Sequence, residues 1–240
     1  MRLAALALVA LALTACESNQ ERSAKLERAA EKHKGEAARR RALAQRALTI
    51  TRVSKKIEIV STELVRGREG DAAIVTLRNT SNTTLSNVPV QIQVRSADGA
   101  SLYTNDIPGL SPTLASVALI PAHAVLTWID DQVQASGLPV SVTAKVGEGT
   151  PSNAAVPELS VQGSHLAEGE TEGNVVNHSQ VSQQELVVNA LARRAGKIVA
   201  AGRAVLPAAS AGAATPFQIF FVGSPTGAQL EVSAPATTPG

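Results

Sequence analysis

Short segments in which hydrophobic and polar residues alternate run through most of the chain beyond residue 56. In the clearest segment every second position from 88 to 94 is valine or isoleucine, and the positions between them carry proline or glutamine. A second segment has leucine, valine or alanine at alternate positions from 186 to 192. A period of two is typical of strands that bury one face and expose the other. The pattern therefore predicts an all-β fold for this part of the chain.

Turn residues divide the remainder into further strands. Clusters of Asn, Ser, Gly and Pro bound each short run of β-branched residues, as expected where strands are joined by tight turns. The predicted strands are residues 57–65, 72–78, 88–95, 101–104, 125–129, 140–146, 172–176, 186–193, 197–201, 217–222 and 230–233.

The two halves of this region follow one plan. A turn of the form Asn-x-Ser, at Asn79 and again at Asn177, precedes each alternating strand. A hairpin glycine follows 20 residues later in the first half (79 to 99) and 19 residues later in the second (177 to 196), and an Ile-Pro or Leu-Pro pair comes next, at 120–121 and 206–207. We therefore expect a first β-sandwich at 56–149, a linker at 150–156, a second β-sandwich at 157–235 and a disordered tail at 236–240.

Short strands with regular turn signals over roughly 90 residues predict immunoglobulin-like sandwiches. The halves also resemble the tandem FxLYD-type domains of bacterial lipoproteins and surface proteins. The resemblance lies in the segment from Gly173 to Ser179, which reads G-x-V-x-N-x-S, and in its counterpart from Leu77 to Ser81. It implies two tandem immunoglobulin-like domains that make contacts rather than perform chemistry.

The amino terminus carries a short apolar run. Residues 3–13 are all Leu, Ala or Val after the single basic residue Arg2, and about 20 apolar residues would be needed to span a bilayer. The run has the proportions of a signal peptide, residues 1–15, followed by small residues suited to a peptidase. The sequence Leu13-Thr14-Ala15-Cys16 resembles a bacterial lipobox.

This resemblance gives the only cysteine of the chain a role. It implies that Cys16 becomes the mature amino terminus and carries a covalent diacylglycerol and fatty acid. Each buried methylene contributes about 0.8 kcal/mol, so two or three acyl chains anchor a protein stably. Glu17 follows, whereas the inner-membrane retention signal of enteric lipoproteins is Asp. The resemblance thus implies a cell-envelope lipoprotein, on the outer membrane facing the periplasm if the host is Gram-negative.

Charge separates a tether, residues 16–55, from the body. Residues 17–56 hold 12 Lys/Arg and 5 Asp/Glu, a net charge of +7, whereas residues 57–240 hold 9 and 15, a net charge of −6. The tether is rich in Ala, Arg, Lys and Glu and lacks Pro, which predicts a helix. Its arginines at 39–41 could attract anionic lipid or simply keep the tether soluble. An exported protein does not normally meet nucleic acid, so we expect none as a partner.

Candidate chemistry is sparse, and we expect no enzyme and no cofactor. The four histidines are scattered singly, without metal-ligand spacing. Glu168, Glu170 and Glu172 alternate and could hold calcium on one face of a strand, or form a solvated edge. Asp130 and Asp131 follow Trp128; because adjacent strand residues face opposite ways, we expect them to cap a helix or turn rather than to form a paired acid/base dyad.

The function hypotheses follow from these patterns. The first is a non-catalytic, membrane-anchored lipoprotein that binds an unknown envelope protein or supports an assembly, with Phe220, Phe221 and Trp128 as a possible interaction surface. The alternative is a ligand- or ion-binding accessory lipoprotein, with its site near residues 150–156 or at residues 168–172. A third, an enzyme, would need a polar cluster that the linear sequence hides.

Overall fold

The computed structural model describes residues 48–68, 70–106 and 112–237, which lie within one compact unit, Ala44–Gly240. This part of the chain is nearly all β, which confirms the prediction from alternation. Cys16, the signal peptide and the tether up to residue 47 lie outside the described residues, as do residues 238–240 of the expected tail. The described end of the expected helical tether, residues 48–55, is not helical, and Val53 forms a β-bridge with Gly147. The expectation of a disordered tail is wrong for Ala236 and Thr237, which are buried, because the Thr237 backbone donates to the Gln183 side chain at 2.8 Å.

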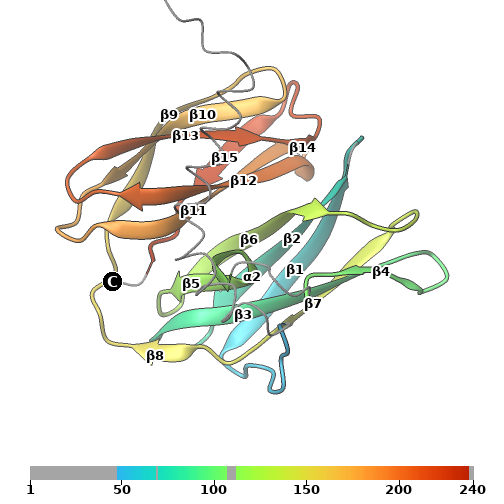
Figure 1. Cartoon of the computed structure of the whole chain (residues 1–240), viewed down its shortest axis with the longest axis horizontal. Coiled ribbons are helices and arrows are strands. Elements are labelled where there is room, and N and C mark those ends of the chain that lie inside the picture. The colour runs from blue at the N-terminus through green and yellow to red at the C-terminus, as the bar shows by residue number, and fades with distance from the viewer. Residues whose placement is uncertain (1–47, 69, 107–111, 238–240) are drawn as a thin grey trace, which may run out of the picture. The chain divides into compact units, whose positions relative to one another are not determined.

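The strands of the first half form two antiparallel sheets, here called the N-terminal half (Figure 1). One sheet has the order β1-β2-β6, and in the other β3 pairs with β4, β5, β7 and β8. The elements are β1 Ile57–Arg66, β2 Asp71–Asn79, β3 Thr84–Arg95, β4 Ser101–Thr104, the single turn α2 Pro112–Ala115, β5 Ser116–Ile120, β6 Val125–Val133, β7 Ser141–Val146 and β8 Thr150–Ser152.

The strands of the second half form two further antiparallel sheets, here called the C-terminal half, with the orders β13-β10-β9 and β14-β12-β11-β15. The elements are β9 Leu159–Leu166, β10 Glu170–Asn177, β11 Gln183–Arg194, β12 Lys197–Ala209, β13 Ala214–Phe220, β14 Val222–Gly223 and β15 Gln229–Ser233. Within the described residues, every sheet is built from strands of one half alone.

Each half has its own apolar core between its two sheets, and a third cluster joins the halves. The predicted inward residues of β3, at 88, 90, 92 and 94, are at most 1% exposed and belong to the first core. The matching residues of β11, Leu186, Val188 and Ala190, belong to the second. The third cluster brings Ile74 and Ile129 of the N-terminal half against Leu191 and Ala201 of the C-terminal half.

The repeat seen in the sequence reappears as two matching corners. The Asn79 side chain donates to the carbonyls of Thr83 (2.8 Å) and Ile120 (3.1 Å) and accepts from the Ser81 backbone (3.0 Å). The Asn177 side chain donates to the carbonyls of Val181 (2.9 Å) and Ala209 (3.0 Å) and accepts from the Ser179 backbone (3.0 Å). Both asparagines are fully buried, and each connects its own turn by hydrogen bonds to the backbone of a neighbouring strand.

These corners correct one part of the predicted repeat. Asn79 bonds the carbonyl of Ile120, and the corresponding bond of Asn177 reaches Ala209 rather than Leu206. The Leu206-Pro207 pair therefore lies three residues before the position that matches Ile120-Pro121 (209 against 206). It falls inside β12, which runs on to Ala209.

Three strands lie where the sequence pattern named none. β5 is short, β8 is a three-residue strand within the expected linker, and β9 contains no buried residue. In addition, the predicted strand at 217–222 is two strands, because the chain leaves β13 at Phe220 and enters the other sheet of its half as β14. A five-residue strand is too short for its alternation to stand out, and strands without buried residues have none to detect.

Candidate functional site

A β-bulge places two acidic side chains at the contact between the halves. Along the β2–β6 ladder, Asp71 lies opposite Val133 and Ala73 lies opposite Asp130. Between these two pairs β6 advances by three residues and β2 by only two, so β6 contains one extra residue. Such a bulge redirects side chains that would otherwise alternate. The two side chains were expected to face opposite ways, which assumed a regular strand; Asp130 does accept a capping hydrogen bond from the Gln132 amide at 3.1 Å, but the bulge lets both carboxylates reach one neighbour.

Both carboxylates meet the same arginine, Arg203 of β12. The guanidinium Nη2 donates to Asp130 Oδ1 at 3.2 Å, and the Arg203 backbone N–H donates to Asp131 Oδ2 at 2.8 Å. Arg203 Nε lies 3.3 Å from Asp131 Oδ1. That last contact is an ion pair without hydrogen-bond geometry, and neither atom has a hydrogen-bond partner among the described residues.

The remaining donors of Arg203 reach backbone oxygens. Nη1 donates to the carbonyl of Leu114 (3.2 Å) and to the carbonyl of Ile129. The side chains of Arg203 and Asp130 are only 3% and 2% exposed, and that of Asp131 is 14% exposed. Burying a charge is costly unless it is paired and hydrogen-bonded. We call Arg203, Asp130 and Asp131, together with Tyr103, the ionic cluster.

Tyr103 completes the ionic cluster from β4. Its hydroxyl donates to Asp130 Oδ2 at 2.9 Å. Burial, and then the adjacent Asp130 carboxylate, raise the pKa of the Tyr103 hydroxyl far above its ordinary value, so it stays protonated and remains a donor. Burial also raises the pKa of Asp131, although Arg203 acts in the opposite direction.

Trp128, the only tryptophan of the chain, lies beside the ionic cluster. The Arg203 guanidinium carbon is 5.9 Å from the centre of its ring, within the range of a cation–π contact. The indole is 5% exposed, and its Nε1 has no hydrogen-bond partner among the described residues. Trp128 thus lies at the contact between the halves and away from the free surface.

The sequence analysis did not single out Arg203. The available signal was weak: Arg203 is the one charged residue in the otherwise uncharged segment from 198 to 209, which contains only Ala, Gly, Val, Leu, Ile and Pro besides it. A lone charge in an otherwise apolar strand indicates a buried partner. The partner, 72 residues earlier in the chain, could not be identified from spacing.

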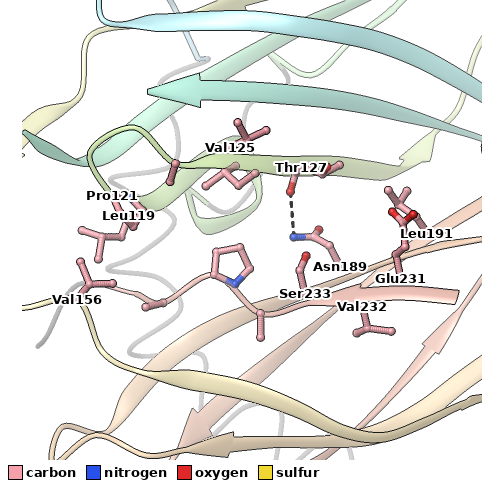
Figure 2. A pocket seen from close by; sticks show the side chains of 15 residues that line it. Leu119, Pro121, Val125, Thr127, Val156, Asn189, Leu191, Glu231, Val232 and Ser233 are labelled. Carbon is pink, nitrogen blue, oxygen red and sulfur yellow. Dashed lines mark hydrogen bonds between the residues drawn. The ribbon is translucent and has the colours of Figure 1, made fainter. Parts of the chain in front are cut away.

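An apolar cleft of about 420 Å³ lies between the halves. Figure 2 shows Val125 and Thr127 of β6 on one wall and Val232 and Ser233 of β15 near the other. Asn189 of β11 bridges the walls, because its Nδ2 donates to the Thr127 carbonyl at 3.3 Å (Figure 2). Val156, from the segment expected as a site for the alternative function, also lines this cleft.

The aromatic residues proposed as an interaction surface have different environments. Phe220, at the end of β13, is 66% exposed, the highest value among the exposed large hydrophobic residues. Phe221 is partly buried against the C-terminal core. Since Trp128 is buried, the three residues do not form one exposed surface, and Phe220 alone is largely accessible.

Two of the three candidate calcium ligands, Glu170 and Glu172, contact neighbouring side chains, whereas Glu168 lies in the turn before β10. Glu170 accepts a hydrogen bond from Gln218 at 2.9 Å, and Glu172 lies 3.2 Å from the imidazole of His165. In the part of the chain that the structure describes, no group of three or more His, Cys, Asp or Glu is placed to hold a metal ion.

Comparisons with known proteins add no relative. No family model matches the chain, and no curated protein matches it. Within the described ranges, the structure contains no helix with the length and apolar character needed to cross a membrane.

Proposed function

We propose that the chain is a bacterial cell-envelope lipoprotein, anchored to a membrane by lipid on Cys16, with a non-catalytic structural or protein-binding body. The observation that carries the proposal is the sequence Leu13-Thr14-Ala15-Cys16 directly after an apolar run of signal-peptide length, with the only cysteine of the chain at the position that would be acylated. A diacylglyceryl group and a fatty acid would hold the protein stably at a bilayer surface.

In this proposal the body consists of two immunoglobulin-like domains related to the FxLYD type. The matching corners at Asn79 and Asn177 support a duplicated unit. In both, the side-chain amide donates to a backbone carbonyl of a distant strand, and the side-chain oxygen accepts from the backbone amide two residues later. Asn87 and Glu185, each eight residues after its corner asparagine, share a left-handed backbone with φ of 50°. Neither half contains the aromatic motif that names the family, so the assignment depends on these turns.

A non-catalytic role agrees with how the buried polar groups are used. The carboxylates of Asp130 and Asp131 are engaged by Arg203, by Tyr103 and by backbone amides. In this proposal the groups are structural, since each carboxylate already has a charge partner and hydrogen-bond donors within the fold.

Metabolic labelling tests the anchor. Cells that express the full chain would be grown with an alkyne analogue of palmitate, and the protein would be compared with Cys16→Ser and with the matched control Ser18→Ala. We expect label and membrane association in the wild type and the control, and loss of both in Cys16→Ser. Label that persists in Cys16→Ser, or is absent from the wild type, contradicts the proposal.

The alternative, a ligand-binding accessory lipoprotein, is favoured by one observation, the apolar cleft between the halves. Its volume lies within the range of small-molecule sites, about 300–1,000 Å³. A fluorescent apolar dye such as N-phenyl-1-naphthylamine should then bind the wild type and the control Val181→Glu, but not Val125→Glu. Equal binding by both variants removes this alternative. The ion-binding version predicts a rise in melting temperature with millimolar calcium, and an unchanged melting temperature dismisses it.

A further inference from the structure

We infer that Arg203 is an ionic latch that holds the N-terminal and C-terminal halves as one rigid body, independently of the segment that connects them. The inference goes beyond the proposed function, since it concerns how the two halves are held together rather than where the protein lies. Its strongest support is the distribution of partners. Arg203 belongs to the C-terminal half, yet its guanidinium contacts Leu114, Ile129, Asp130 and Asp131, all of the N-terminal half.

The ionic cluster is complete only when the halves are in contact. Asp130 has the Tyr103 hydroxyl and the Gln132 amide as partners within its own half, and among the described residues Arg203 supplies the only positive charge placed at either carboxylate. Removing the guanidinium would leave buried carboxylates without a counter-ion, which is far more destabilising than the loss of an exposed pair.

The latch also covers a free strand edge. Among the described strands, β6 pairs with β2 alone, on one side, and the edge of a sheet presents unpaired backbone groups. Side chains of the C-terminal half satisfy carbonyls of β6: Arg203 donates to Ile129 and Asn189 donates to Thr127. The edge of one half is therefore closed by side chains of the other.

Apolar packing surrounds these polar contacts. Ile74 and Ile129 are at most 1% exposed, and Leu191 is 5% exposed, although none of the three belongs to the internal core of its own half. The outward face of β11 is buried at this point because it faces the N-terminal half. A buried ion pair inside an apolar contact favours one relative orientation over others.

The connecting segment is accessible and makes a direct test possible. Residues 153–156 are all exposed, so a recognition site for a specific protease can be inserted between Ala154 and Ala155. After cleavage, size-exclusion chromatography over a dilution series reports whether the halves stay together. The fluorescence of Trp128, beside the latch, gives a second readout.

The variants are Arg203→Met, Arg203→Lys and the control Arg78→Met, which removes an exposed ion pair with Glu58 inside one half. We expect the cleaved wild type and control to elute as one species. Arg203→Met should weaken association of the cleaved halves by about 100-fold or more. Arg203→Lys should weaken it less, because an ammonium group cannot reproduce the guanidinium fork. If Arg203→Met does not fold, Arg203→Lys carries the comparison.

Two results overturn the inference. In the first, the cleaved wild-type halves separate at the same concentration as those of the Arg203 variants. In the second, the halves of the Arg203 variants remain together through the same dilutions as those of Arg78→Met.

Discussion

Tyr103 is the only tyrosine of the chain, and its hydroxyl donates to a carboxylate that is almost fully buried. Ionisation of this phenol would place a second negative charge beside Asp130, in a site that burial already shields from water. For both reasons the pKa of Tyr103 is raised in the folded protein. A single tyrosine also means that absorbance changes of tyrosinate report on this site alone.

We predict that spectrophotometric titration near 295 nm shows no tyrosinate in the folded protein at pH values where free tyrosine, with a pKa of about 10, is already ionised. The contribution of Tyr103 to stability is complete below the unfolded pKa and is lost as the pH rises toward the folded pKa. Tyr103→Phe should therefore be less stable than wild type at pH 8, and the difference should shrink above pH 10. A difference that stays constant with pH contradicts the assigned contact.

The two corner asparagines act through their amide donors. Each side-chain nitrogen donates to two or more backbone carbonyls inside the fold. A carboxylate of the same size would face these carbonyl oxygens without a proton to share. The chemistry of the corner thus requires an amide rather than merely a small polar residue.

We predict that Asn177→Asp lowers the free energy of unfolding by about 2–4 kcal/mol, because a buried acceptor would replace a buried donor. Asn153→Asp, at an exposed position, should change it by less than about 0.5 kcal/mol. Urea denaturation of both variants measures the difference. Equal stability of the two variants would show that the corner does not depend on the amide.

At the scale of the element, alternation predicted the strands that bury one continuous face. It located β3 and β11, whose inward residues contribute to the two cores. It also predicted β4 with the bounds that the structure shows, residues 101–104. It could not find β8, three residues long with Pro151 in its middle, or β9, in which no residue is buried. Neither strand has a buried face from which a period can be read.

The candidate site escaped prediction for a different reason. The bulge at the end of β6 arises from the pairing with β2, and pairing is not visible in the sequence of one strand. The outer face of β11 was expected to be exposed to solvent. Asn189 and Leu191 on this face are only 5% exposed, because they pack against the other half. Long-range contacts, and not local propensity, decide both features.

Close approach of two strands places a strict limit on one glycine. A Cβ atom built on Gly202 of β12 would lie 2.3 Å from the Phe220 carbonyl oxygen and 2.8 Å from Ile219 Cγ2. These atoms belong to β13 and its core side chain, so they cannot move without shifting the facing sheet. Gly202 therefore sets the separation of β12 and β13.

We predict that Gly202→Ala lowers the free energy of unfolding by about 1–3 kcal/mol, the usual cost of overpacking a core. Gly137→Ala is the matched control, since its new Cβ would meet only the flexible end of Leu102 at 3.3 Å. It should be close to neutral. Chemical denaturation followed by circular dichroism compares the two, and a neutral Gly202→Ala would contradict the packing described here.

At the scale of the whole molecule, the distribution of charge along the sequence distinguishes the amino-terminal tether from the body. Residues 17–56 carry a net charge of +7 and residues 57–240 carry −6, so the basic charge lies next to the proposed lipid and the acidic charge on the folded body. The acidic body and an anionic lipid surface would repel each other weakly, whereas the basic segment would be attracted to that surface. In the proposed arrangement the latched halves form a single binding unit attached through its amino-terminal tether.

Intact-mass spectrometry of the protein purified from the membranes of its own cells tests the lipid anchor most directly. The account predicts a mature chain that begins at Cys16 and carries the added mass of a diacylglyceryl group and an amide-linked fatty acid. A chain that begins at Met1, or a Cys16 sulfur without lipid, would contradict it.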